Sequence, residues 1–300
     1  MTLQEQIRSN RVRSIIVMLG FGMLVAAIGF AASYAYDPSV LGIIGIVGIV
    51  YGLISYFNAG KMIARASGAI PISKAQAPAL YRAVENAAIG AGLARTPDVY
   101  LVQDSAPNAF AAGRSPETAY VAATSGLLEQ LDERELLGVM AHEIAHVRNL
   151  DVRLMSLAAV MVGVIALATD MLMRAAWYGG GSRREGSGGM IAIVIGLLAA
   201  ILAPLVASML QMALSRRREY LADATAVEIT GDPIGLAQAL EKLRDDSQPL
   251  RKVTRATAHM YIESPLRDHH GLRSSLGGMF DTHPPLEDRI ARLRTLAGEA

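Results

Sequence analysis

The sequence has no cysteine and few charged residues. The absence of cysteine excludes disulfides, thiolate zinc sites, iron–sulfur clusters and cysteine nucleophiles, so any metal must be bound by histidine and carboxylate side chains. Only 18% of the 300 residues are charged, against about 25% in an ordinary soluble domain. The net charge of +1 gives no indication of a nucleic-acid partner. With 52% apolar residues, the composition excludes a disordered chain and disfavours a purely soluble protein.

Four apolar runs organise the chain. Ser14–Tyr36 and Pro38–Gly60 each contain 23 residues without a charge. At 1.5 Å per residue each run gives roughly 34 Å of helix, enough to cross a hydrocarbon core of about 30 Å. Met190–Ser215 is another long run, whereas Leu154–Met173 is weaker, contains Asp170, and has a buried core helix as its alternative. We therefore expect about four transmembrane helices. The first run exceeds the usual apolar stretch of about 7–15 residues in a cleaved signal peptide.

The positive charges that flank these runs predict the orientation of the chain. With four spans, the following groups fall on one side, which should be the cytoplasmic one: Arg8, Arg11, Arg13, Lys61, Arg65, Arg148, Arg153 and Arg216–Arg218. The last loop partly disagrees, because it places Arg174, Arg183 and Arg184 outside.

The same layout predicts the domain boundaries. Residues 1–60 form a transmembrane hairpin, and residues 154–212 hold two further spans with a Gly-rich loop at 178–189. The polar blocks 61–153 and 213–300 combine into one domain on the cytoplasmic side.

Periodicity predicts helices and short strands in the first polar block. Ala79–Gly92 has helical apolar spacing and ends at a glycine. Asp98–Val102 and Ala119–Ala123 are typical of short strands. Between them, Ala106–Gly113 is a turn that leads into a strand of small residues.

The chemistry lies in the segment His-Glu-Ile-Ala-His at residues 142–146. Asp132 and Glu135 have the spacing of a capping box that starts the host helix. His142 and His146 are then four residues apart on one helical face, so both imidazoles can reach one ion. Glu143 is rotated by about 100° around the helix axis from His142, so it is placed to contact a water beside the ion rather than the ion itself. The alternative is a pair of surface histidines, but the apolar neighbours favour a metal site.

A catalytic zinc usually takes three protein ligands, so a third is needed. The downstream candidates are Glu219, Asp223, Glu228, His259, His269, His270 and His283. Glu219 and Asp223 stand four residues apart just after the last apolar run. One can bind the metal while the other accepts a hydrogen bond from a liganding histidine. The alternative is an ordinary helix whose carboxylates are solvated beside Arg216–Arg218.

These motifs resemble the M48 metallopeptidases, whose pattern is HExxH followed by ExxxD. The match consists of residues 142–146 and the segment Ser-Arg-Arg-Arg-Glu-Tyr-Leu-Ala-Asp at 215–223. Pro107–Ala111, and Thr282–Leu286 with Arg289, are similar to other recurring segments of that family. The layout resembles the four-span bacterial members rather than the seven-span CAAX-processing ones. The resemblance covers nearly the whole chain, apart from the Gly-rich loop and Leu250–Gly278.

The resemblance implies a mainly α membrane protein with an α+β zincin-type (gluzincin) catalytic domain that contains a small sheet. It implies that His142, His146 and Glu219 bind one zinc and that Glu143 is the general base. Asp223 would orient His142. Further roles are implied for the following residues: Asn149 would support the site, the edge strand Asn108, Ala109, Phe110 and Ala111 would pair with an extended substrate, and His283 or a nearby tyrosine would donate to the oxyanion.

The resemblance thus implies a zinc endopeptidase of the bacterial cytoplasmic (inner) membrane, acting at the cytoplasmic face on unfolded or damaged membrane proteins. Two alternatives stay open. A site-2-type intramembrane protease would place HExxH within a span, against which the nearby Arg148, Asp151 and Arg153 argue. A non-catalytic scaffold would hold a structural zinc through four protein ligands, and the presence of Glu143 argues against that reading.

Overall fold

The computed structural model describes residues 5, 8–10, 12–20, 22–23, 39–161, 216–246, 260–262 and 284–299. Most of the first apolar run, the run Met190–Ser215, the Gly-rich loop and His283 lie outside these residues. So do His259, His269 and His270, three of the candidate third ligands.

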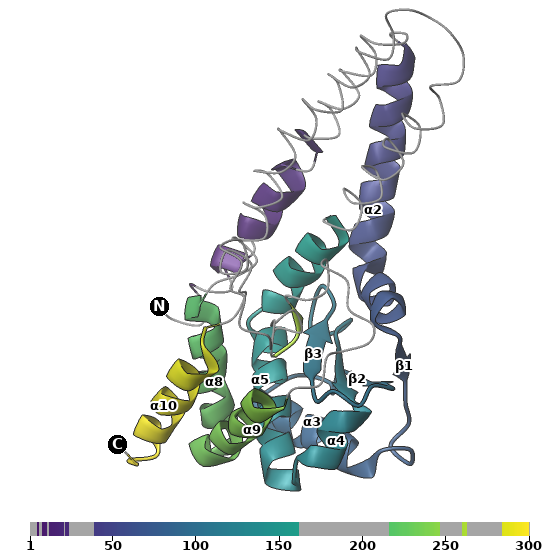
Figure 1. Cartoon of the computed structure of the whole chain (residues 1–300). Coiled ribbons are helices and arrows are strands. Elements are labelled where there is room, and N and C mark those ends of the chain that lie inside the picture. The colour runs from purple at the N-terminus through teal and green to yellow at the C-terminus, as the bar shows by residue number, and fades with distance from the viewer. Residues whose placement is uncertain are drawn as a thin grey trace, which may run out of the picture.

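A long helix, α2 (Ser39–Ser67), covers the second apolar run and projects from the body of the molecule (Figure 1). Residues 12–20 and 151–161 are also helical. Within the ranges described here, no helix is both long and apolar enough to cross a membrane. The four transmembrane segments stay a prediction.

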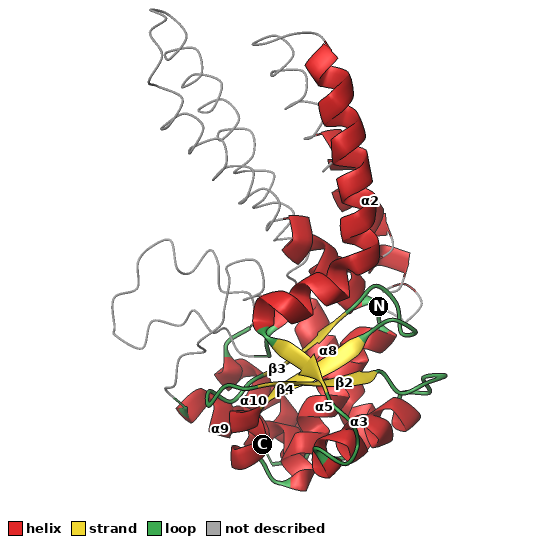
Figure 2. Cartoon of the chain, turned by 90° about the vertical axis from the view of Figure 1, so that its right-hand side faces the viewer, coloured by secondary structure: helices red, strands yellow, loops and turns green. Residues whose placement is uncertain are grey.

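The body contains a small mixed sheet of four strands in the order β1-β2-β4-β3. The strands are β1 (Ala69–Pro71), β2 (Asp98–Val102), β3 (Ala109–Ala112) and β4 (Tyr120–Thr124). The strands β2 and β4 are parallel, and the other two pairs are antiparallel. The predicted strand 98–102 is confirmed, and the second lies one residue further along than predicted. The strand of small residues, β3, forms one edge of the sheet (Figure 2).

The sheet separates two apolar clusters. Helices α3 (Pro78–Gly90) and α5 (Glu133–Arg148) share one cluster with Ala109 and Ala111 of β3. Phe110 and Ala112 point to the other face, where they pack with Met155 from the helical stretch that follows α5. The alternation of side chains along β3 therefore places its odd-numbered residues toward α5.

The start of α5 is fixed by the predicted capping box. The Asp132 carboxylate accepts the Glu135 N–H at 2.8 Å, and the Glu135 carboxylate accepts the Asp132 N–H at 2.8 Å. Lys242 of α9 (Pro233–Asp245) donates to Glu135 at 2.6 Å. Gly138 allows α5 and α9 to approach closely, since a Cβ there would lie 2.8 Å from the Leu236 nitrogen. The short α4 (Ser125–Gln130) precedes α5, and α8 (Arg216–Thr230) and α10 (Leu286–Leu296) complete the helical layer (Figure 1).

Candidate metal centre

The two histidines of α5 lie side by side in the interior. His142 is fully buried, His146 is 3% exposed, and their Nε2 atoms are 3.1 Å apart. Glu143 is 2% exposed. The spacing of four residues places both imidazoles on one face of α5, as predicted, and both rings present Nε2 to the same point in space.

Glu219, in the first turn of α8, reaches that same point. Its carboxylate oxygens lie 3.7 Å from His142 Nε2 and 3.5 Å from His146 Nε2. One ligand atom from each of the three residues lies within 4.8 Å of the other two. Across the residues that the structure describes, this is the single His/Asp/Glu cluster with such geometry. Two imidazole nitrogens and a carboxylate in a buried position are a donor set that fits a metal ion.

Asp223 and Arg289 form a buried ion pair next to His142. Asp223 Oδ1 lies 2.9 Å from His142 Nδ1. Arg289 of α10 donates to both Asp223 oxygens, from Nε at 2.9 Å and from Nη2 at 2.6 Å. From the sequence, Arg289 was only part of a segment that resembles the M48 family, with no predicted role. Its signal was present, since it shares the apolar face of α10 with Leu286 and Ile290, and a charge there requires a buried partner.

His146 has its own carboxylate partner, which the sequence analysis missed. His146 Nδ1 lies 3.0 Å from Asp151 Oδ2, and Asp151 is fully buried. Asp151 stands five residues after His146, beyond the end of α5. No helical spacing predicts that contact, because it depends on how the chain turns after the helix.

Asn149, predicted to support the site, is the C-terminal cap of α5 and is fully buried. Its backbone carbonyl accepts a hydrogen bond from Asn10 at 2.9 Å. Its side-chain amide has no hydrogen-bond partner in the described part of the chain. A role of this side chain at the metal centre therefore stays a prediction.

The predicted substrate strand is an edge of the sheet, but its outer side is partly covered. Asn108 precedes β3, and its side chain accepts the Ala109 N–H at 3.0 Å. The Ile262 N–H donates to the Ala109 carbonyl at 3.0 Å, and Phe110 forms an antiparallel bridge with Tyr261. A segment far along the chain thus pairs with part of this edge, and pairing of β3 with a substrate stays a prediction.

Burial and charge set the protonation of the groups next to His142. Burial raises the pKa of Glu143 to about 7, and the nearby Glu219 carboxylate adds to that shift. Burial would also raise the pKa of Asp223, but the Arg289 charge outweighs it and lowers that pKa to about 2. Burial and the Arg289 charge lower the pKa of His142 to about 4. At neutral pH His142 is therefore neutral, as a metal ligand must be.

His146 behaves differently because two carboxylates face it. Burial would lower its pKa, but Glu219 and Asp151 outweigh burial and raise the pKa to about 9. Below that pH the metal-free His146 holds a proton, which a metal ion bound there would have to displace. The metal affinity of such a site would therefore fall as the pH falls.

These features define a class of protein. Two histidines and a glutamate converge from two helices, and a buried glutamate with a pKa near 7 stands directly after the first histidine. This is the arrangement of a metallopeptidase of the HExxH class.

The particular family follows from comparison of the sequence with known proteins. The profile of peptidase family M48 matches residues 74–297, and the chain belongs to this family. It is 44% identical to a "Protease HtpX homolog" of Ligilactobacillus salivarius (strain UCC118), over 97% of this chain and 99% of that protein. It is 41% identical to a protein of the same description from Streptococcus gordonii, over 98% of this chain and 100% of that one.

Among the solved structures, the chain is similar to one titled "Crystal Structure of S. mikatae Ste24p". It has a TM-score of 0.49 and 17% sequence identity, over 96% of this chain and 66% of that chain. This similarity is too low to support a conclusion about function.

Proposed function

We propose that this metallopeptidase is a membrane-bound zinc endopeptidase that cleaves unfolded or damaged membrane proteins at the cytoplasmic face of a bacterial inner membrane. The observation that carries the proposal is the convergence of His142, His146 and Glu219 beside Glu143. The bilayer as a partner is supported by the four apolar runs, and the cytoplasmic orientation by the arginines and lysines that flank them.

Zinc is the proposed metal because of the donors available. The chain has no thiolate, and two histidines with one glutamate are a known set for catalytic zinc. His142, His146 and Glu219 would hold the ion and leave a position open, whereas a structural site is closed by four protein ligands. When bound, zinc polarises the scissile carbonyl and lowers the pKa of water.

Glu143 is the proposed general base. A pKa of about 7 suits a group that takes a proton from the attacking water and passes it to the leaving amine. The Ala111 N–H donates a hydrogen bond to the Glu143 carboxylate and holds it next to β3.

Asp223 is the proposed partner that orients His142. Accepting a hydrogen bond from Nδ1 leaves the Nε2 lone pair of His142 available to the metal. Arg289 keeps Asp223 ionised in this buried position.

The substrate would bind as an extended strand along β3. Unfolded chains offer the backbone donors and acceptors that strand addition requires. Because the Ile262 N–H already donates to the Ala109 carbonyl, the substrate must displace the segment 260–262 in order to pair along the whole strand. An oxyanion donor at His283 stays a prediction, since that residue lies outside the described ranges.

A reversible disulfide between β3 and the segment 260–262 tests the proposal that the substrate binds along β3. The Ile262 N–H bond to the Ala109 carbonyl flanks the Phe110–Tyr261 bridge, so this pair is of the type without direct hydrogen bonds. Such pairs typically have Cα atoms about 4.5 Å apart, within the range of about 4.4–6.8 Å for disulfides. Since the chain has no cysteine, the double variant Phe110→Cys/Tyr261→Cys has a single possible disulfide within one molecule. We expect the oxidised, zinc-loaded variant to lose cleavage of an unfolded substrate, and reduction to restore it.

The two single-cysteine variants, treated with the same oxidant, control for the loss of each aromatic ring. Formation of the disulfide is checked by mass spectrometry. If the oxidised double variant cleaves as fast as its reduced form, the substrate does not need this edge of β3.

A further inference from the structure

The metal centre receives a contact from the N-terminal part of the chain. Asn10 lies in the N-terminal helix, formed by residues 8–10 and 12–20, whose later part belongs to the first apolar run. It stands more than 130 residues before the histidines and is only 2% exposed. Its side-chain nitrogen donates to Asp151 Oδ1 at 2.7 Å. The other oxygen of Asp151 is the one that lies 3.0 Å from His146. A chain of two hydrogen bonds thus leads from the N-terminal helix to a metal ligand.

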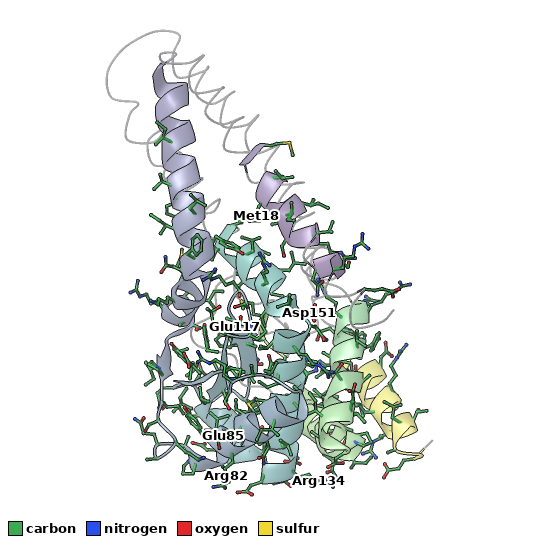
Figure 3. The ribbon with its side chains drawn as sticks, turned by 180° about the vertical axis from the view of Figure 1, so that it is seen from behind. Met18, Arg82, Glu85, Glu117, Arg134 and Asp151 are labelled. Atoms are coloured by element: carbon green, nitrogen blue, oxygen red, sulfur yellow. The ribbon has the colours of Figure 1, made fainter. Side chains whose placement is uncertain are left out.

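The turn after α5 brings Asp151 into place. The helix ends at Arg148, Asn149 caps it, and Leu150 takes a left-handed backbone conformation with φ 59°. That conformation is unfavourable for a leucine, and it interrupts the helix directly before Asp151, whose side chain lies against His146. Figure 3, in which Asp151 is labelled, shows it where the N-terminal helix, the end of α5 and the start of α8 meet.

Asn10 uses every polar atom of its amide to hold this arrangement. Besides Asp151, its nitrogen donates to the Asn149 carbonyl at 2.9 Å, so both amide hydrogens are used. Its oxygen accepts from Arg218 at 3.5 Å. Arg218 Nε lies 3.8 Å from Asp151 and directly precedes the ligand Glu219 in the chain. Asn10 therefore bridges the two segments that supply His146 and Glu219.

We infer that Asp151 and Asn10 are positioning residues of the metal centre. Asp151 accepts from His146 Nδ1, which fixes the ring orientation and leaves Nε2 for the metal. Asn10 holds Asp151 in the rotamer that makes this contact. The inference rests on the proposed function, because it assigns the metal to His142, His146 and Glu219.

The contact also links docking of the N-terminal helix to the metal site. Asn10, Ser14 and Val17 recur at helical spacing, and all three are buried. This face of the helix packs into the body, and Asn10 is the member of the face that contacts Asp151. Displacing the N-terminal helix would therefore loosen His146.

The test is zinc affinity, measured by chelator competition on the whole chain in detergent. Outer partners of liganding histidines typically contribute about 10–100-fold to metal affinity, so we expect Asp151→Ala to weaken zinc binding within that range and Asn10→Ala to weaken it by a smaller factor. In the double variant, Asn10→Ala should add no further loss, because its effect passes through Asp151. Ser14→Ala is the matched control, since the Ser14 hydroxyl donates to the Asn10 carbonyl of its own helix, and its affinity should equal that of the unmodified chain.

Any other outcome contradicts either the proposed function or the inference about Asn10 and Asp151. If the unmodified chain binds no zinc, the proposed function fails and this inference fails with it. If it binds zinc and Asn10→Ala binds equally well, only the inference fails. Equal losses in Asn10→Ala and Ser14→Ala, or fully additive losses in the double variant, would also overturn it. If Asn10→Ala does not fold, Asn10→Ser replaces it, with a smaller loss expected because its hydroxyl can still donate one hydrogen bond.

Discussion

Replacing Glu143 with glutamine is expected to abolish peptide hydrolysis while the chain still binds one zinc. Glutamine has nearly the same shape, and its oxygen can accept the Ala111 N–H, but it cannot take a proton from water. General-base catalysis contributes about 10²–10⁴-fold to a rate, so kcat should fall by at least about 10²-fold. The measurement combines kcat on an unfolded membrane protein with metal analysis of the same sample.

Glu135→Gln is the matched control for this experiment. Glu135 is a buried glutamate on the same helix, but it is paired with Lys242 and serves the capping box. Its replacement should leave kcat within a few-fold of the unmodified chain. Undiminished cleavage by zinc-loaded Glu143→Gln would remove Glu143 from the reaction.

Replacing Glu219 with alanine is expected to weaken zinc binding by more than about 100-fold, the upper end of what partners outside the ligand set contribute. The side chain lies opposite both Nε2 atoms, at 3.7 Å from His142 and 3.5 Å from His146, and no other described carboxylate completes the cluster. Chelator competition measures the affinity, and peptidase activity at limiting zinc should fall in parallel.

Glu228→Ala is the control for Glu219→Ala. Glu228 was also a candidate ligand from the sequence and lies on the same helix, but its side chain is 70% exposed and lies 3.6 Å from Arg148. Zinc affinity should be unaffected by its removal. If Glu219→Ala binds zinc as tightly as the unmodified chain, a different residue is the third ligand.

The parts of the fold that depend on neighbouring residues could be predicted from the sequence. The capping box at Asp132 and Glu135 sets the start of α5, and the 3.6-residue period then places His142 and His146 on one face. The strand at Asp98–Val102 follows from its composition. Spacing alone left several candidates for the third ligand. The resemblance to M48 metallopeptidases selected Glu219 among them.

The contacts that sequence reasoning missed depend on tertiary structure. Asp151 reaches His146 across a turn in which Leu150 adopts a left-handed backbone conformation, and a leucine gives no signal for that conformation. The pairing of Tyr261 with Phe110 joins segments about 150 residues apart, and no local pattern encodes the register of such a pair. The position of Arg289 on the apolar face of α10 indicates a buried charge, but its partner Asp223 lies 66 residues away in the chain and only the tertiary structure identifies it.

The most direct test of the central claim is a zinc titration of the metal-stripped chain, with cleavage of an unfolded membrane protein followed at each step. We expect no cleavage without metal, and a rate that rises with added zinc and levels off at one equivalent per chain. Cleavage that persists in the stripped protein, or that does not respond to the first equivalent of zinc, would contradict the assignment of His142, His146 and Glu219 as the centre of a zinc peptidase.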